Sequence, residues 1–314
     1  MKKAIKKRKI YDCVCDSEGA IVEKKLTKVV YLDETENVIR EEIYNENQID
    51  VLVENTFVNK VPSSPEGRLQ KTQQTDYVNQ IQQTWEFIYD EFGRKIEQRE
   101  HFQEGGFVPT KFEYTIEGKL KMEAVLDDDG KVESKIDYEY DTIGNLIKKV
   151  EYDTDDFTTP WVSVSYEYDI NNKVVKKEEQ FADKDATTST FEYDEAGEMI
   201  GGQIYYSDNK DLIVDQKVME DEDGNVIGTE IFYPKENMKK ESLIKRNEND
   251  KIVEEEVLIN GNFNSLTVFN YNEENDMVTE KYLNSLGNGE FQQWTAKAYD
   301  LEYWENSAAK NEEK

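Results

Sequence analysis

YEYDTIGNL, residues 138–146, is the stretch that decides the fold of this chain. It places two aromatic residues around a Glu, then Asp141, two free positions, Gly144 and, two residues on, an apolar Leu. Close variants are FIYDEFGRK at 87–95 and FEYDEAGEM at 191–199. An Asp side chain accepts hydrogen bonds from the backbone amides that follow it, and Gly reaches positive φ without strain. Each copy therefore predicts a tight turn.

Turns of this kind recur along the chain at a regular distance. Their first residues are 12 to 14 residues apart, or 25 to 28 where a weaker turn lies between them. A period of about thirteen residues corresponds to a strand of eight or nine residues plus a turn, and two periods make a hairpin. The residues expected at positive φ are Gly93, Gly118, Gly130, Gly144, Gly197, Gly224, Gly287, Asn172, Asp211, Asn237, Asp250 and Asn275.

The segments between the turns alternate with a period of two. In WVSVSYEYD (161–169), Val162, Val164, Tyr166 and Tyr168 point to one face of a strand. The residues between aromatics in the related segments are acidic, which predicts one apolar, aromatic face and one acidic, solvated face. The glutamates of the expected acidic face are Glu113, Glu139, Glu167 and Glu192.

The fold class expected is all-β: a long antiparallel β-meander of about twenty strands. Open twisted sheets rarely exceed about ten strands without curling, so we expect the meander to roll into a spiral or barrel-like sheet. Apolar residues at helical spacing over three turns are absent from the sequence, apart from a weak pattern in TDYVNQIQQTW (75–85).

Four regions are expected from the regularity of the pattern. Residues 1–60 contain looser β-repeats, and residues 61–84 are expected to be an expanded loop or irregular region, because VPSSPEG (61–67) holds two of the five prolines. Residues 85–290 are the regular repeats. Residues 291–314 are expected to form a C-terminal cap and a frayed tail.

Composition and charge limit the partners. The chain has 314 residues, of which 34% are charged, with 69 Asp and Glu against 39 Lys and Arg and a formal net charge of −30. Such a field repels nucleic acid and favours a basic protein partner. An alternative interpretation of the charge is solubility of a much-exposed sheet. The oligomeric state does not follow from the sequence.

Localisation is expected to be cytoplasmic. The basic start MKKAIKKRK is not followed by the apolar run of about 7–15 residues that a secretory signal requires. The sequence also lacks a run of about 18 apolar residues, so membrane insertion is not expected. The alternative is a protein exposed at the surface, or exported, by a non-classical route.

Three turns resemble the YD repeats of Rhs- and teneurin-type proteins. The residues that carry the resemblance are YDEFGR (89–94), YDTIGN (140–145) and YDEAGE (193–198), and the likeness extends over residues 85–290. It implies long antiparallel strands that spiral into a hollow shell. Proteins of that family use the shell to enclose toxins or to bind partners at surfaces.

Two departures restrict what the resemblance implies to architecture. Neither a self-cleaving aspartate core motif nor a toxin domain follows the repeats in this sequence, so we expect neither. A lesser likeness is to the short Tyr- and Gly-containing repeats of MORN-like antitoxin proteins, at GKLK (118–121) and GKV (130–132).

Catalytic chemistry is not expected. His101 is the single histidine and has no recognisable nucleophile motif, and no Walker loop, G-x-G-x-x-G or H-E-x-x-H sequence occurs. Cys13 and Cys15, two residues apart, are expected to pack as ordinary strand residues. DDDG at 127–130 fits a turn better than a calcium loop, because it does not continue into the EF-hand pattern. We therefore expect no enzyme activity, no metal and no cofactor.

Exposed tryptophans and glutamates are the candidate binding residues. Trp161 is out of phase with its apolar neighbours, and Trp294 and Trp304 are expected near a sheet end, where they cap the sheet or anchor a partner. The partner-binding set is Trp161, Glu139, Glu167, Glu192, Trp294 and Trp304. We expect a non-enzymatic protein-binding protein, such as an immunity protein or a chaperone-like partner of a toxin or secreted protein. The alternative is a surface module that binds carbohydrate or another cell's protein.

Overall fold

The computed structural model describes residues 4–58, 67–153, 157–285 and 294–304, and in these residues it contains 22 strands and no helix. The prediction of an all-β meander is confirmed. The strands are β1 (Ile5–Cys15), β2 (Ile21–Leu32), β3 (Val38–Asn45), β4 (Gln48–Val58), β5 (Arg68–Asp76), β6 (Ile81–Tyr89), β7 (Lys95–His101), β8 (Phe107–Tyr114), β9 (Leu120–Leu126), β10 (Val132–Tyr140), β11 (Leu146–Asp153), β12 (Val162–Tyr168), β13 (Val174–Phe181), β14 (Thr187–Tyr193), β15 (Met199–Tyr206), β16 (Leu212–Glu220), β17 (Val226–Tyr233), β18 (Met238–Arg246), β19 (Ile252–Ile259), β20 (Asn262–Tyr271), β21 (Met277–Asn284) and β22 (Thr295–Tyr303).

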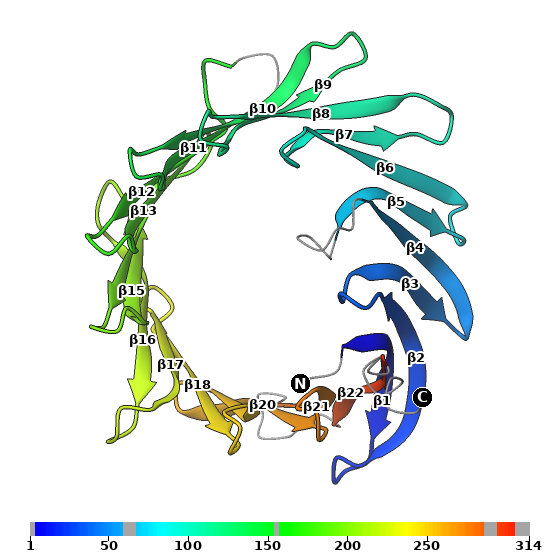
Figure 1. Ribbon diagram of the computed structural model, residues 1–314. Coiled ribbons are helices and arrows are strands. Elements are labelled where there is room, and N and C mark those ends of the chain that lie inside the picture. Colours follow the sequence, from blue (N-terminus) through cyan, green and yellow to red (C-terminus); the bar gives the residue numbers. More distant parts are fainter. Residues whose placement is uncertain (1–3, 59–66, 154–156, 286–293, 305–314) are drawn as a thin grey trace, which may run out of the picture.

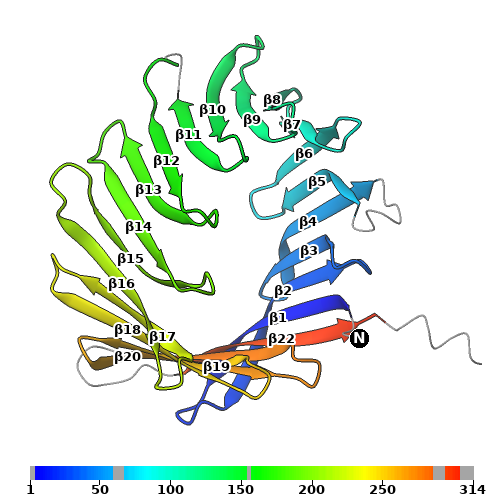
Figure 2. The same cartoon turned by 60° about the vertical axis from the view of Figure 1, so that its left-hand side comes forward.

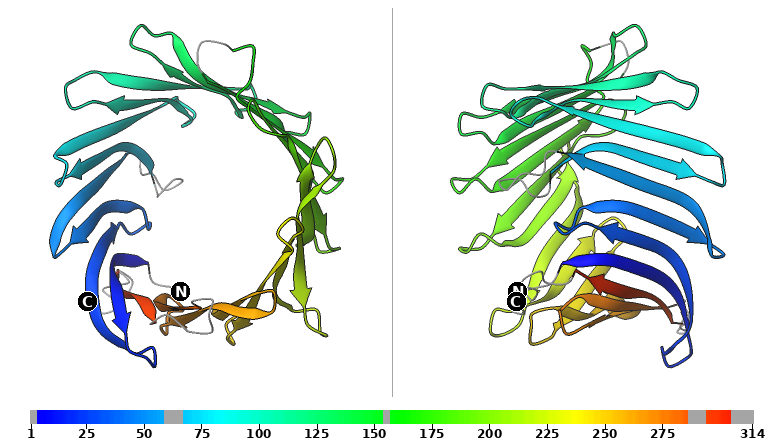
Figure 3. Two further views of the ribbon diagram at one scale, coloured as in Figure 1. Left: turned by 180° about the vertical axis from the view of Figure 1, so that it is seen from behind. Right: turned by 45° about the vertical axis from the view of Figure 1, so that its right-hand side comes forward.

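Each strand pairs antiparallel with the next one along the chain, and β22 pairs with β1, so the sheet closes into a barrel (Figure 1). The seam runs from Ile5 opposite Tyr303 to Val14 opposite Thr295. Figure 3 shows the first and last strands side by side from two directions. No helix in the described part of the chain is long and apolar enough to cross a membrane.

The barrel is wide and its core is thin. With 22 strands spaced about 4.8 Å apart, the circumference is roughly 106 Å and the diameter roughly 34 Å before any strand tilt. The accessible surface is 20531 Å², whereas a compact monomer of this mass would expose about 13,600 Å². Solvent therefore reaches both faces of the sheet.

Regular strands lie in two regions that were expected to be irregular or to form a cap. Residues 68–84, expected to be irregular, form β5, a tight turn and the start of β6, including the stretch with the weak helical pattern. The expected C-terminal cap contains β22, which is the strand that closes the barrel. The remainder of the VPSSPEG loop before Gly67, and the expected frayed tail from residue 305, lie outside the described residues.

The strands themselves are nearly neutral. They contain 26 Lys and Arg against 31 Asp and Glu, so the segments outside the strands hold the remaining 13 basic and 38 acidic residues. Both faces carry ion pairs, such as Glu167–Lys176 at 2.8 Å on one face and Lys177–Glu179 at 2.9 Å on the other. The expectation of one acidic face is therefore wrong, because strand register places lysines beside the glutamates.

Turns alternate between the two ends of the barrel, because consecutive strands run in opposite directions (Figure 2). One end, here called the aspartate rim, carries the YD turns. In the turn of residues 141–145, the Asp141 carboxylate accepts hydrogen bonds from the amides of Ile143 and Asn145 at 3.0 and 2.8 Å. The Gly144 amide donates to the Asp141 carbonyl, and Gly144 has φ of +97°. The turns of this rim that share the backbone bonds begin at Asp33, Asp90, Thr115, Asp141, Asp169, Asp194, Asp221, Asn247 and Asn272.

Replacing Gly144 by valine is expected to destabilise the protein more than Glu139→Ala. A β-branched residue at φ of +97° costs of order 1 to 2 kcal/mol, whereas a half-exposed strand position changes stability by about 0.5 kcal/mol or less. Thermal unfolding of the two variants provides the comparison. Equal melting temperatures would contradict the importance of the turn geometry.

The tyrosine of the YD motif connects one hairpin to the one before it. The Tyr140 hydroxyl donates to the carbonyl of Leu120, which stands two residues after Gly118 of the preceding turn on the aspartate rim. The residue between them, Lys119, places its ammonium over the Tyr140 ring at 5.1 Å. We call this arrangement the tyrosine latch. The hydroxyl–carbonyl pairs are Tyr89–Leu69 (2.7 Å), Tyr114–Lys95 (2.7 Å), Tyr140–Leu120 (2.8 Å), Tyr168–Leu146 (2.7 Å), Tyr193–Val174 (2.9 Å) and Tyr271–Ile252 (2.8 Å).

Tyr168→Phe is expected to lower the free energy of unfolding by about 1 kcal/mol, because the carbonyl of Leu146 loses its side-chain donor. Tyr166→Phe is the matched control: Tyr166 lies two residues earlier on the same strand and face, and its hydroxyl has no hydrogen bond within the described residues. Denaturant unfolding of both variants measures the difference. A larger loss in the control would contradict the latch.

Candidate functional site

Four consecutive turns of the aspartate rim hold large apolar side chains out into solvent. Phe92, Ile116, Ile143 and Ile170 are 73%, 97%, 72% and 97% exposed. They occupy the two middle positions of the turns that join β6 to β7, β8 to β9, β10 to β11 and β12 to β13. The backbone–backbone hydrogen bonds of these turns join the first residue to the fourth and fifth, and the high exposure of the four apolar side chains shows that they point away from the sheet. We call this set the apolar arc.

The other turns of the aspartate rim that the structure describes carry polar or small residues at the same positions. Examples are Glu195 and Ala196 between β14 and β15, and Glu222 and Asp223 between β16 and β17. The latches of Tyr114, Tyr140 and Tyr168 connect the four turns of the apolar arc to one another. The arc is thus one contiguous and mutually braced part of the rim.

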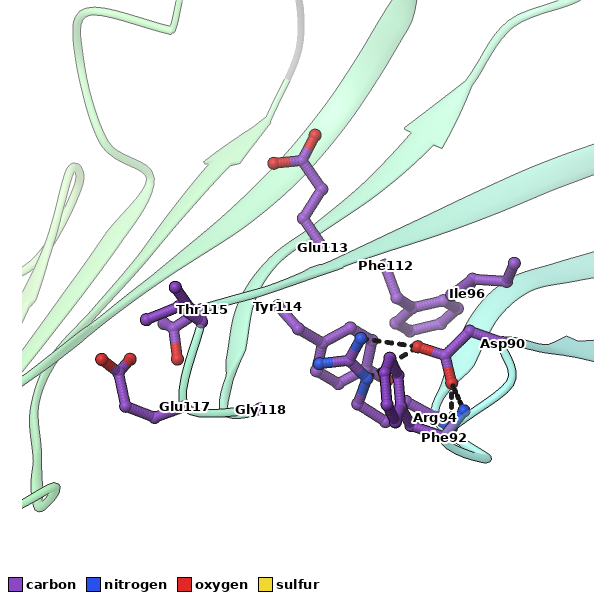
Figure 4. A pocket seen from close by; sticks show the side chains of 11 residues that line it. Asp90, Phe92, Arg94, Ile96, Phe112, Glu113, Tyr114, Thr115, Glu117 and Gly118 are labelled. Carbon is purple, nitrogen blue, oxygen red and sulfur yellow. Dashed lines mark hydrogen bonds and ion pairs between the residues drawn. The ribbon is translucent and has the colours of Figure 1, made fainter.

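An open groove of about 870 Å³ lies between the first two turns of the arc (Figure 4). Arg94 lies along it: its guanidinium contacts the Asp90 carboxylate at 2.7 Å and lies 4.9 Å from the centre of the Tyr114 ring. Phe92 and Phe112 contribute further aromatic surface. Burial raises the pKa of Asp90, whereas hydrogen bonds from the Arg94 amide and guanidinium lower it. The second effect is larger, so the pKa of Asp90 lies below its usual value. The groove therefore combines an ion pair with one exposed aromatic ring, that of Phe92.

Acidic residues flank the apolar tips. Glu91 and Glu117 are exposed beside Phe92 and Ile116 in the same turns. The carboxylate of Asp141 is occupied by amides of its own turn, whereas those of Glu91 and Glu117 have no hydrogen-bond or ion-pair partner in the described part of the chain. These side chains favour a partner with basic residues around an apolar patch.

The three glutamates predicted to bind a partner lie on one face of the sheet, next to the aspartate rim. Glu139 is 4.0 Å from Lys148 and Glu167 is 2.8 Å from Lys176, so two of them have cationic neighbours on the adjacent strand. Glu192 is exposed and pairs in register with Gly201. Cross-strand neighbours thus neutralise two of the three charges.

The three tryptophans do not share this location. Trp161 is 45% exposed at the start of β12, on the opposite rim. Trp294 packs against Gly19 and the small cluster that contains Cys13 and Ala298. Trp304 donates its backbone amide to the carbonyl of Ala4, and the Lys6 ammonium is 5.4 Å from its ring centre. Trp294 and Trp304 therefore belong to the seam of the barrel.

Sequence reasoning missed the apolar arc. The D-x-x-G pattern sets no residue type at its two middle positions, so no role was assigned to them from the sequence. In the structure they are the most exposed positions of the turn. Large apolar residues there in four successive motifs were the available signal.

A buried carboxylate on the sheet, that of Glu42, is surrounded by hydrogen-bond donors. Glu42, only 5% exposed, accepts hydrogen bonds from the hydroxyls of Tyr44 and Tyr31 at 2.6 and 3.2 Å and from Arg40 Nε at 2.9 Å. Burial raises its pKa, but these donors lower it more, so the pKa lies below its ordinary value. Burial and the bond to Glu42 raise the pKa of Tyr44 to about 12. Because its donors satisfy the carboxylate, the cluster is structural.

Glu42→Gln is expected to destabilise the protein by about 1.5 to 3 kcal/mol at pH 7, the range for hydrogen bonds to a charged group. The pKa of Glu42 is lower in the folded state than in the unfolded state. Ionised Glu42 therefore stabilises the folded protein fully at pH values above the unfolded-state pKa, and this stabilisation is lost as pH falls through the folded-state pKa. Denaturant unfolding at pH 7 and pH 3 should show the difference between wild type and variant shrinking at pH 3. An equal difference at both pH values would contradict this role.

The two cysteines and the single histidine are the other residues considered for chemistry in the sequence analysis. Burial raises the pKa of the Cys13 and Cys15 thiols, which disfavours the reactive thiolate. His101 Nε2 is 3.1 Å from a Glu86 carboxylate oxygen. Within the residues that the structure describes, no group of three or more His, Cys, Asp or Glu side chains is placed to hold a metal ion.

Comparisons with known proteins give only distant likenesses. No family model matches the chain, and no curated protein matches it in sequence. Crystal structures of TcdB2-TccC3, with and without the hypervariable C-terminal region, align at a TM-score of 0.42 and 12% identity, covering 96% of this chain and 18% of theirs. A porin-like protein from Bacteroides uniformis aligns at a TM-score of 0.35 and 10% identity, covering 96% of this chain and 98% of its own. The chain thus spans about a fifth of the TcdB2-TccC3 chain.

Proposed function

We propose that this β-repeat protein is a non-enzymatic binding protein and that the apolar arc is its contact surface for a protein partner. The observation that carries the proposal is the row of Phe92, Ile116, Ile143 and Ile170, each at least 72% exposed, on four braced turns. Large exposed apolar side chains grouped on one part of a surface, with polar residues around them, are typical of interaction sites. Latched turns need little ordering when a partner binds, which reduces the entropic cost of association.

The partner we propose is a basic protein. The described segments outside the strands hold 31 acidic and 8 basic residues, so negative charge is concentrated where the strands end. Such a field accelerates association with a cationic surface and disfavours nucleic acid. The role we propose is that of an immunity protein or chaperone-like partner of a toxin or secreted protein, in the cytoplasm, and the repeat architecture and the acidic charge of the chain are the observations that support it.

A second candidate function is a surface or exported module that binds carbohydrate. Trp161, 45% exposed on the opposite rim, is the observation that favours it, because an exposed indole stacks on sugar rings. Binding of oligosaccharides that is lost in Trp161→Ala and unaffected by changes in the apolar arc would favour this second function.

Capture from an extract of the source cell tests the first proposal. The baits are wild type, a variant with Phe92, Ile116, Ile143 and Ile170 all changed to Ser, and a control with Ala196→Ser and Asn249→Ser in polar turns of the same rim. We expect wild type and control to retain the same basic protein and the fourfold variant to lose at least nine-tenths of it, with unchanged melting temperature. Equal capture by all three baits would overturn the proposal.

A further inference from the structure

The apolar arc has a regular step. Its successive turns are separated by two strands, and neighbouring strands are about 4.8 Å apart, so successive tips are roughly 10 Å apart, or somewhat more where strands tilt. The four turns share the same backbone hydrogen bonds, and the latch bonds of Tyr114, Tyr140 and Tyr168 are all 2.7 or 2.8 Å. The distance between successive apolar tips is therefore set mainly by the spacing of the strands in the sheet.

Closure of the barrel restricts the form that a partner segment can take. In the described part of the chain every strand is paired on both sides, including β1 with β22 and β2. A partner therefore finds no free strand edge to which a further strand can be added. Binding has to use side chains at the rim or on the faces.

An α-helix matches the step of the arc and a β-strand does not. A strand repeats side chains of one face every two residues, at about 6.6 Å or 13 Å, whereas three residues, at about 10 Å, lead to the opposite face. A helix advances about 10.5 Å in seven residues and returns to within about 20° of the same face. Apolar residues at every seventh position of a helix therefore meet successive tips.

We propose that the apolar arc receives an amphipathic α-helix of the partner, with an apolar residue at every seventh position and Lys or Arg beside them. This inference rests on the proposed function and specifies its partner. The basic flanks are complementary to the exposed Glu91 and Glu117. Because the rim curves (Figure 1), a straight helix contacts three tips at once, and every such set includes Ile116 and Ile143.

Two labelled helical peptides of identical composition test the inference. Both contain three Leu in an Ala- and Lys-rich sequence of about 22 residues, one with Leu at every seventh position and the other at every fourth. Fluorescence anisotropy with the full chain is expected to show at least tenfold tighter binding of the first peptide. The double variant Ile116→Ser, Ile143→Ser should lose that binding, and Ala196→Ser with Asn249→Ser should keep it.

Equal affinity for the two peptides, or binding indifferent to the double variant, would overturn the helix inference. Cellular capture that depends on the arc would in that case leave the proposed function standing and exclude only the helical partner. If neither capture nor peptide binding responds to changes in the arc, both proposals fail.

Discussion

Gly228→Ala is expected to lower the free energy of unfolding by about 3 kcal/mol, because one added methyl group has no room between two paired strands. A Cβ atom at Gly228 would overlap the backbone oxygen of Ser242 and would lie 3.1 Å from the Cα of Leu243. Those atoms belong to β18, which is hydrogen-bonded to β17 at this position. The backbone cannot rotate away as a flexible side chain would, so the two strands have to separate.

Gly130→Ala is the matched control for this prediction. Gly130 has φ of +77° but has no atom within 4 Å of its added Cβ, so only the conformational cost of roughly 1 kcal/mol applies. Thermal unfolding of the two variants should show a clearly larger fall in melting temperature for Gly228→Ala. If Gly130→Ala lowered the melting temperature more than Gly228→Ala, the close approach of β17 and β18 at Gly228 would not be what makes an added methyl group costly.

Ala298→Pro is expected to open the barrel. Ala298 lies in β22, is 1% exposed, and pairs with Tyr11 of β1 and Thr279 of β21. Proline removes the backbone donor, and its ring does not fit within a strand paired on both sides, at a cost of about 3 kcal/mol or more. Opening the seam would expose two unpaired strand edges, which are templates for association between chains.

The control for the seam is Glu195→Pro. Glu195 is the second residue of the turn that begins at Asp194, a position where proline fits a type I turn. Light scattering and thermal unfolding should show aggregation and a large loss of stability for Ala298→Pro and neither for Glu195→Pro. A monomeric Ala298→Pro variant with unchanged melting temperature would contradict the seam as a site of closure.

Local chemistry explains why the turns were predictable. Asp141 and Gly144 act within five residues of each other, through amides of the same turn and a positive φ, and no distant contact is needed. The same holds for the alternation of Val162, Val164 and Tyr166 along one strand. The turn and strand patterns together were sufficient to predict an antiparallel meander. The number of strands expected was too large for an open sheet, so curling was predicted as well.

Features that depend on strand register were not predictable in the same way. The acceptor of the Tyr140 hydroxyl is the carbonyl of Leu120, twenty residues earlier, which comes into reach only after two strands have paired. Glu139 was expected on an acidic face, but strand pairing places Lys148 beside it. Part of the candidate site was therefore misread, since charge on a sheet is set by neighbours on other strands.

Local sequence was enough to establish where this chain turns, which residues alternate along its strands, and that its sheet is too long to stay open. Closure, the tyrosine latches and the apolar arc were decided only in three dimensions. β1 and β22 are nearly 300 residues apart in the chain, and their pairing depends on the twist accumulated over all the strands between them. Phe92, Ile116, Ile143 and Ile170 form a surface only because two strands separate each turn from the next and bring the alternate turns to one rim.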